Sequence, residues 1–210
     1  NLLVTRQKIN RLCALARHAS MTVAVDSPGN VGDLSEVASA GGVELDVVVY
    51  INTGLNGCGV EPGQAAVDLA RQVRDAAGLN FAGLMADDGS ALMEDSEQLS
   101  IESRRRVQQV LDAREMMEKA GIEIRVVSVG GTHNYEIAGA MDGVTEVPAG
   151  SYALMDERYR PCMPQFVNAA RIMSCVTSMP EAGNVVTDAG RKAIGGDLEN
   201  PGVPTVPGAE

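Results

Sequence analysis

The sequence has few aromatic side chains and a shortage of positive charge. Its 210 residues include no Trp, two Phe and four Tyr, and 17 Lys and Arg stand against 28 Asp and Glu, giving a net charge of −11. With so few aromatic rings, the sequence offers no platform on which nucleic-acid bases would stack. Phosphate backbones and anionic membranes are bound by surplus Lys and Arg. The composition therefore argues against both as partners, and any phosphate must be held by local groups.

Long apolar runs and cysteine motifs are also missing. No segment is long and apolar enough to cross a membrane, and the first residues lack the basic-then-apolar order of a secretion signal. We therefore expect a soluble, cytoplasmic protein. No C-x-x-C pair or Cys/His cluster is present, so neither a zinc site nor a disulfide framework is indicated. We expect four reduced thiols, at Cys13, Cys58, Cys162 and Cys175.

Apolar runs of strand type alternate with segments of helical periodicity. The middle of the stretch 45–52 is apolar on both faces, which is typical of a parallel strand buried on both sides. Alternating strands and helices predict right-handed crossovers and a parallel sheet. The expected strands are 21–26, 45–52, 81–86 and 124–129, with strand-like stretches at 2–5 and 144–156, and the expected helices are 6–19, 31–40, 61–77 and 96–120.

The pattern changes near residue 166, where the expected strands 170–178 and 184–194 follow one another without a helix. We therefore predict an α/β fold in two parts. Residues 1–164 form a partial (β/α)8 TIM-type barrel, with about six of the eight strands that a closed barrel needs. Residues 165–210 begin an antiparallel β-domain. The first barrel strands would precede Asn1, so the sequence reads as a piece of a longer chain.

The run 124–129 ends in a glycine turn that suits an anion. Glycine lets the backbone approach a phosphate, and the hydroxyls of Ser128 and Thr132 add possible donors. The segment that follows can direct a helix N-terminus to the same point. The other interpretation is a plain strand-to-helix turn that binds nothing, which is the more common case for a lone Gly-Gly-Thr. The candidate residues of this turn are Ser128, Gly130, Gly131, Thr132 and His133.

A second turn of the same kind follows the next strand-like stretch, at Gly150, Ser151 and Tyr152. In a barrel of this type, ligands bind at the C-terminal ends of the strands, and phosphates often bind at the loops after the last two. Two such turns on adjacent strands would specify a phosphate better than one. The alternatives are an ordinary turn serine at 151, a half-buried strand tyrosine at 152 and a purely structural side chain at His133.

Five motifs in order resemble the family of D-threonine aldolase and D-serine dehydratase, which belongs to the alanine-racemase-like pyridoxal-phosphate enzymes. The resemblance spans nearly the whole chain. The motifs are the glycine-rich stretch 52–63, Phe81-Ala82-Gly83-Leu84-Met85, Gly130-Gly131-Thr132, Ala149-Gly150-Ser151-Tyr152 with Met155-Asp156, and Asp188-Ala189-Gly190 with Lys192-Ala193.

The resemblance implies a pyridoxal 5′-phosphate lyase that cleaves or dehydrates β-hydroxy D-amino acids, and it implies a β-domain that supplies a divalent-metal site. The partner would be a small D-amino acid, and the protein a monomer or a homodimer. By motif match, the phosphate would be held by Ser128, Gly130, Gly131, Thr132, His133, Gly150, Ser151 and Tyr152. In these enzymes the pyridine ring is an electron sink for charge that develops at Cα.

The sequence departs from the family's pattern at several functional positions. A Schiff base needs a lysine at the barrel mouth, but Lys8 is on the first expected helix, Lys119 is in the last turn of another, and Lys192 is in the second domain. The Schiff-base lysine would lie upstream, and the metal ligands beyond Glu210. Gly57 stands where the family usually has an arginine, Asn52 where an aspartate is common, and Ser90 where a histidine is usual.

Three functions remain open at this point. The first is a pyridoxal-phosphate lyase whose lysine and metal site lie outside this sequence, so that the piece alone is inactive. The second is a non-catalytic relative that keeps the cofactor pocket, as the departures at Gly57 and Ser90 suggest. The third is an amino-acid racemase of the same superfamily, which is disfavoured because Asp188-Ala189-Gly190 resembles the lyase branch.

Overall fold

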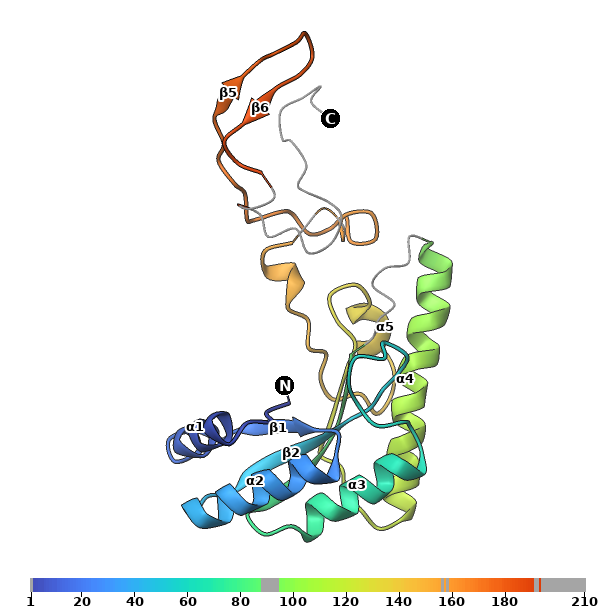
Figure 1. Ribbon diagram of the computed structural model, residues 1–210. Coiled ribbons are helices and arrows are strands. Elements are labelled where there is room, and N and C mark those ends of the chain that lie inside the picture. The colour runs from blue at the N-terminus through green and yellow to red at the C-terminus, as the bar shows by residue number, and fades with distance from the viewer. Residues whose placement is uncertain (1, 88–94, 156, 158, 191–192, 194–210) are drawn as a thin grey trace. The chain divides into compact units, whose positions relative to one another are not determined.

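A computed structural model describes residues 2–87, 95–155, 157, 159–190 and 193 (Figure 1). The chain divides into two compact units, residues 1–150 and residues 151–210. The two units are described separately. Ser90 and Lys192, which mattered for the resemblance, lie outside the described residues.

The first unit is built on a sheet of four parallel strands in the order β1-β2-β3-β4. Segments at both edges extend it, because Leu2 forms a parallel bridge with Ala24 and Glu146 forms one with Ser128. The predicted parallel sheet is therefore confirmed, and four strands with two bridged segments account for the expected strand positions. The strands are β1 (Thr22–Val25), β2 (Leu45–Tyr50), β3 (Leu79–Ala86) and β4 (Val126–Val129).

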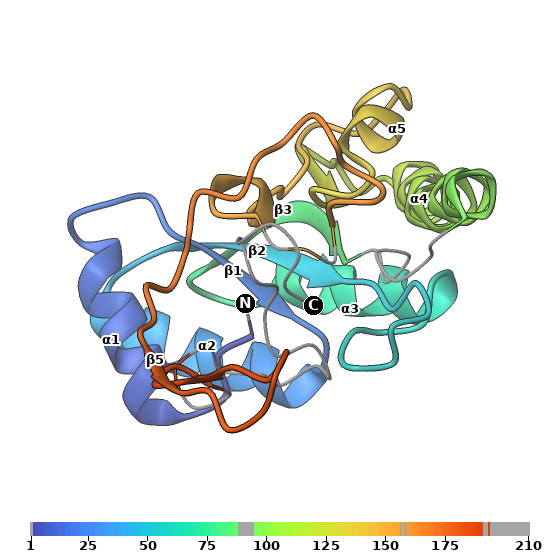
Figure 2. The same ribbon diagram turned by 90° about the horizontal axis from the view of Figure 1, so that it is seen from above.

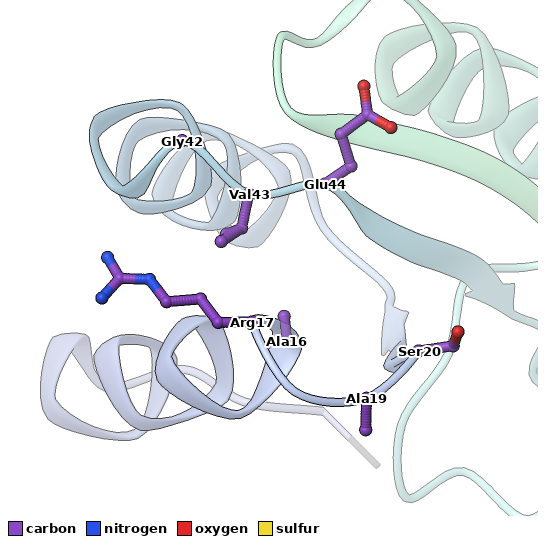
Figure 3. Close-up of a pocket in the computed structure, with 7 residues that line it drawn as sticks. All are labelled: Ala16, Arg17, Ala19, Ser20, Gly42, Val43 and Glu44. Carbon is purple, nitrogen blue, oxygen red and sulfur yellow. The ribbon is translucent and has the colours of Figure 1, made fainter.

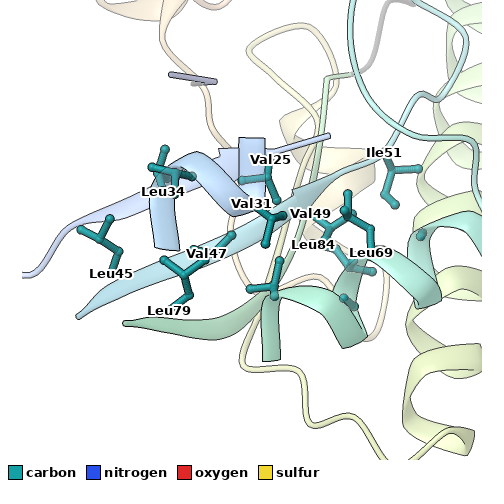
Figure 4. Packing of buried hydrophobic residues seen from close by; sticks show 14 of the residues in the cluster. Val25, Val31, Leu34, Leu45, Val47, Val49, Ile51, Leu69, Leu79 and Leu84 are labelled. Carbon is teal, nitrogen blue, oxygen red and sulfur yellow. The ribbon is translucent and has the colours of Figure 1, made fainter. Parts of the chain in front are cut away.

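Helices join successive strands and cover one face of this sheet (Figures 1 and 2). Their apolar sides form one core cluster with the strand residues that point toward them, including Val47, Val49 and Leu84 (Figure 4). Each fully buried Val or Leu side chain contributes about 1.5–3 kcal/mol relative to an exposed one. The helices are α1 (Arg6–Ala16), α2 (Pro28–Gly41), α3 (Gln64–Asp75), α4 (Ser96–Lys119) and α5 (Tyr135–Gly139).

The opposite face of the sheet, here called the inner face, carries a second and smaller cluster. Successive strand residues point to opposite faces, so Val48 and Tyr50 of β2 point away from the helices. They pack with Ala24 of β1 and Ala82 of β3, and none of the helix residues that the structure describes belongs to this cluster. This separation is what a barrel segment requires, with helices outside and strand residues inside.

Two helices begin at positions that the sequence analysis missed. The sequence pattern predicted a helix from residue 31. Helix α2 instead begins at Pro28, because the hydroxyl of Ser27 accepts a hydrogen bond from the N–H of Asn30. This is an N-cap followed by proline at the first helical position. Conversely, α3 was expected from residue 61 and begins at Gln64, after Gly63. Capping chemistry and backbone geometry, more than apolar periodicity, fixed these ends.

Two side chains of α4 are placed against the usual tendency of their residue types. Ile101 is apolar, yet it is 62% exposed. Arg106 is charged, yet its side chain is only 11% exposed and its Nε lies 2.7 Å from Glu102 Oε1. The methylene part of an arginine can cover apolar surface while its head group pairs with a carboxylate. Arg105 also pairs with Glu102, so the two arginines hold one carboxylate.

The second unit contains a short 3-10 helix and a hairpin. The 3-10 helix spans Ser151–Ala153, and strands β5 (Val176–Ser178) and β6 (Val186–Thr187) pair antiparallel. The predicted antiparallel pairing is confirmed, although both strands are shorter than expected. Asp188 ties the hairpin together, because its Oδ1 accepts from the N–H of Cys175 at 2.8 Å and the hydroxyl of Ser174 at 2.9 Å.

The break between the units falls between Gly150 and Ser151, earlier in the chain than the predicted boundary at residues 164 and 165. Interactions inside the second unit explain this position. The ring centroids of Tyr152 and Phe166 lie 5.8 Å apart. The carbonyl of Leu154 accepts a hydrogen bond from the N–H of Ala169. The domain boundary of the whole protein stays a prediction.

The paired arginines make Glu102 a measurable source of stability. Hydrogen bonds from Arg105 and Arg106 lower the pKa of Glu102 from 4.5 to about 2. A folded-state pKa below the unfolded value stabilises the fold above pH 4.5, and this is lost as the pH falls toward 2. Glu102→Gln should therefore cost about 1 kcal/mol at pH 7 after solvent screening, and progressively less in acid.

Urea unfolding at pH 7, 4 and 3 would measure this difference. The matched control is Glu115→Gln, since Glu115 pairs with Lys119 on the same helix but both side chains are more than 60% exposed. That substitution should change the free energy of unfolding by less than about 0.5 kcal/mol. An equal loss of unfolding free energy in the two variants at pH 7 would contradict a special stabilising role of Glu102.

Candidate functional site

The carboxyl edge of the sheet carries the candidate residues of the first unit. Ser128 is on the inner face of β4, because its neighbours Val127 and Val129 belong to the helix-covered cluster. It is only 2% exposed, and its Oγ has no hydrogen-bond partner among the described residues. A buried hydroxyl without a partner costs about 1–3 kcal/mol. Ser128 therefore offers an unused hydrogen-bonding group at this edge.

The turn after β4 requires a glycine at position 130. Gly130 has a φ of +101°, which L side chains rarely adopt. A Cβ there would lie 2.9 Å from Cβ of Ala138 and 3.0 Å from Oδ1 of Asn134. The backbone therefore passes closer to α5 than any side chain would permit.

Asn134 shapes this turn, and the sequence analysis did not single it out. The N–H of Gly131 donates to Asn134 Oδ1 at 2.8 Å, and Asn134 is only 1% exposed. This N–H is one of the donors expected to hold a phosphate, and here it is used within the turn. Asn side chains often form hydrogen bonds to backbone groups a few residues away, and such bonds shape turns. Asn134 was therefore a signal that the sequence itself offered.

Thr132 and His133 are buried rather than exposed at the edge. Thr132 is 3% exposed and His133 4% exposed. The imidazole lies against the backbone of Gly131, where an added Cβ would be 3.1 Å from His133 Cε1. The following helix, α5, has only five residues. Its dipole is correspondingly small, so the expected help from a helix N-terminus is weaker than predicted.

Gly150 lies in the first unit, after the segment that pairs with β4. The hydroxyl of Thr145 accepts from the N–H of Val127 at 2.8 Å, and Glu146 bridges Ser128 in parallel. Since parallel strands end at the same edge of a sheet, Gly150 follows toward the edge that carries the Gly130 turn. The structure thus brings Ser128–His133 to one edge of the first unit, beside the segment that leads to Gly150, since a Cβ at Gly130 would lie 3.3 Å from Cγ1 of Val147.

Ser151 and Tyr152 belong to the second unit, in the 3-10 helix. Tyr152 is 50% exposed and its ring is tilted by 45° against that of Phe166. The expectation of a strand tyrosine is therefore wrong, because the chain turns into a helix at this point. A shared pocket of Ser151 and Tyr152 with the Gly130 turn stays a prediction.

Asn52 organises the glycine-rich loop after β2. Its Oδ1 accepts from the N–H groups of Gly54 and Asn56, and its Nδ2 donates to Asn56 Oδ1 and Glu61 Oε1. An aspartate cannot donate, so it would lose the last two bonds. The departure at Asn52 thus has a structural reason, since its amide closes the loop onto Glu61.

A hydrogen-bonded pair at the ends of β2 and β3 was also missed. The hydroxyl of Tyr50, which is 6% exposed, donates to Asp87 Oδ2 at 2.6 Å. The hydroxyl of Thr53 donates to the carbonyl of Asp87 at 2.8 Å. Burial, and secondly the carboxylate of Asp87, raise the pKa of Tyr50 above its usual value, so the phenol stays protonated. The period-two pattern of β2 could have placed Tyr50 on the inner face.

The structure also shows the surroundings of Gly57 and of two of the lysines, at positions where the sequence departs from the family's pattern. A Cβ at Gly57 would meet nothing within 4 Å, so the missing arginine leaves open space. Lys8 lies exposed on α1, and Lys119 pairs with Glu115 at the end of α4. Neither lysine is at the carboxyl edge of the sheet.

A surface groove at the other edge of the sheet is not part of this site. It lies between the ends of α1 and α2 (Figure 3), and its lining includes Arg17, Val43 and Glu44. Ligands of α/β barrels bind at the carboxyl ends of strands, whereas Glu44 directly precedes β2. Within the described ranges, no group of three His, Cys, Asp or Glu is placed to hold a metal ion. No helix among the same residues has the length and apolarity to span a membrane.

The role of Asn134 in the turn can be tested by substitution. Asn134→Ala removes the oxygen that accepts a hydrogen bond from the N–H of Gly131. Loss of this acceptor should lower the free energy of unfolding by about 1–3 kcal/mol. Urea unfolding measures this cost, and faster hydrogen exchange at Gly131 would locate it. The control is Asn80→Ala, since Asn80 is exposed and forms a long 3.4 Å bond to Glu44. An equal loss of unfolding free energy in both variants would argue against a role of Asn134 in holding the turn.

Comparisons with known proteins agree with this architecture. The chain is 32% identical over 215 residues to D-threonine aldolase from Arthrobacter sp, covering 99% of the chain and 56% of that protein. It is 34% identical over 197 residues to 3-hydroxy-D-aspartate aldolase from Paracoccus denitrificans, covering 89% of the chain and 51% of that protein.

The crystal structure of D-threonine aldolase from Filomicrobium marinum superposes with a TM-score of 0.88 at 36% identity, over 91% of the chain and 53% of that structure. The chain thus spans about half the length of the relatives that it matches. Residues 2–157 match the family model of the alanine racemase N-terminal domain, and the chain belongs to that family.

Proposed function

We propose that the carboxyl edge of the first unit holds the phosphate of pyridoxal 5′-phosphate. This proposal rests on the buried hydroxyl of Ser128, which has no hydrogen-bond partner in the described part of the chain and lies beside a turn whose geometry requires glycine at position 130. A phosphate oxygen would give that hydroxyl an acceptor, and backbone N–H groups of such a turn suit an anion. The proposed contacts are Ser128, Gly130, Gly131, Thr132, His133 and Gly150, with Ser151 and Tyr152 from the second unit.

The whole protein would be a lyase acting on β-hydroxy D-amino acids. Support comes from the names of the relatives, which act on D-threonine or 3-hydroxy-D-aspartate. Pyridoxal phosphate supplies an electron sink for negative charge at Cα. The residues of this chain would fix the phosphate and keep the inner face of the sheet dry. The lysine and the divalent metal that the family resemblance implies would come from outside the residues described here.

The complete gene product, incubated with pyridoxal phosphate, would test this function. We expect visible absorbance of a protein-bound cofactor, its covalent fixation by borohydride, and release of an aldehyde from D-threonine or 3-hydroxy-D-aspartate. For a dehydratase, ammonia would be released instead. Absence of bound cofactor would refute the proposal.

A non-catalytic cofactor-binding relative is the second candidate. The open space at Gly57, where the family usually has an arginine, favours it. Such a protein would show the absorbance band and leave all D-amino acids intact. The racemase alternative predicts interconversion of D- and L-alanine without aldehyde or ammonia. The three outcomes differ in products, so one set of assays separates them.

Substitution of Ser128 tests the phosphate contact separately from the reaction. Ser128→Ala removes a hydroxyl that has no described partner, so the stability of the fold should be unchanged or slightly higher. The same variant should bind pyridoxal phosphate at least about tenfold more weakly, because a hydrogen bond to a charged group is worth about 1.5–3 kcal/mol. Ser103→Ala, at a fully buried serine of α4, is the control and should bind the cofactor normally.

A further inference from the structure

A carboxylate stands at the mouth of the proposed site, on the same face of the sheet as Ser128. The register of the parallel strands pairs Tyr50 with Met85 and Met85 with Ser128. Because side chains alternate, Asp87, two residues after Met85, returns to this inner face. Neighbouring strands lie about 4.8 Å apart, so Asp87 leaves β3 one strand away from the Gly130 turn.

This carboxylate is held in place at two points. The buried phenol of Tyr50 donates to Asp87 Oδ2, and Thr53, itself 2% exposed, donates to the Asp87 carbonyl. Tyr50 belongs to β2, so the side chain of Asp87 is drawn to the β2 side of β3, away from the turn on β4. The negative charge is therefore kept apart from the phosphate turn but remains at the same edge. Asp87 itself is exposed to incoming molecules.

No positive charge among the described residues compensates this carboxylate. Asp87 forms no ion pair with any of them, and neither does Asp26, whose Oδ2 accepts from the N–H of Gly59 nearby on the inner face. Gly57 in the adjoining loop carries no side chain. Arg106, which lies against Gly54, is paired with Glu102. The carboxyl edge of the sheet thus carries two fixed negative charges, Asp26 at the end of β1 and Asp87 at the end of β3.

We infer that Asp87 is a specificity-determining residue that disfavours a substrate with a second carboxylate, so that the site takes β-hydroxy D-amino acids with uncharged side chains. This inference rests on the proposed function. Like charges within several ångströms repel appreciably near a protein surface. A dicarboxylate such as 3-hydroxy-D-aspartate would meet this repulsion, whereas D-threonine presents a methyl group there. Specificity of this kind comes from an unfavourable contact with the wrong ligand.

The test compares D-threonine with 3-hydroxy-D-aspartate on the complete gene product loaded with pyridoxal phosphate. Dissociation constants from calorimetry and kcat/KM for aldehyde release are measured for both. We expect the unmodified protein to prefer D-threonine at least about tenfold. Asp87→Asn keeps an acceptor for Tyr50 and removes the charge, so it should reduce this preference by at least about fivefold, chiefly by tightening the dicarboxylate. Tyr50→Phe, which frees the charge, should reduce it less.

Asp33→Asn is the matched control, because it removes the same charge from the exposed surface of α2 and should leave the preference unchanged. Equal binding of both amino acids by the unmodified protein, binding of neither, or an unchanged ratio in Asp87→Asn would overturn the inference. Aldehyde release with an unchanged ratio would reject the role of Asp87 and leave the proposed function intact. A changed binding ratio with release of neither aldehyde nor ammonia would do the reverse.

Discussion

The parallel pairing of β2 between β1 and β3 is the constraint on which the rest of the first unit depends. Each strand residue must point either toward the helices or toward the inner face. In β2, Val47 and Val49 enter the large core, and Val48 and Tyr50 face the other way. The same alternation brings Ser128 to the inner face of β4. Polar groups can gather at the carboxyl edge because most of the buried apolar residues are on the helix side of the sheet.

At this edge, the backbone is held by side-chain amides and hydroxyls more than by regular secondary structure. Asn134 closes the turn after β4, Asn52 closes the loop after β2, and Thr53 fixes the chain where it leaves β3. Each of these groups satisfies a backbone donor or acceptor that a loop would otherwise leave to water. The loops are therefore preorganised, and a ligand would not have to supply the ordering free energy.

The placement of charge at the edge follows from the same network. Asp87 would move freely at the end of a strand, but the phenol of Tyr50 and the hydroxyl of Thr53 fix both its carboxylate and its backbone. Gly59 lets the loop pass close to β2, since a Cβ there would lie 2.7 Å from the backbone nitrogen of Asn52. That close approach brings the N–H of Gly59 to Asp26. The close approach of the loop to β2 therefore also fixes the position of the Asp26 carboxylate.

The sequence by itself determined the alternation of strands and helices, the parallel sheet and the antiparallel hairpin, because period-two and helical patterns are local and directly report burial. It also located the glycine turn at residues 130 and 131. Only the tertiary structure decided the pairing of Tyr50 with Asp87 and the burial of Arg106 against the loop at Gly54, since each depends on which segments lie side by side. Tyr50 and Asp87 are separated by 37 positions in the chain, and only the register of β2 on β3 brings them together.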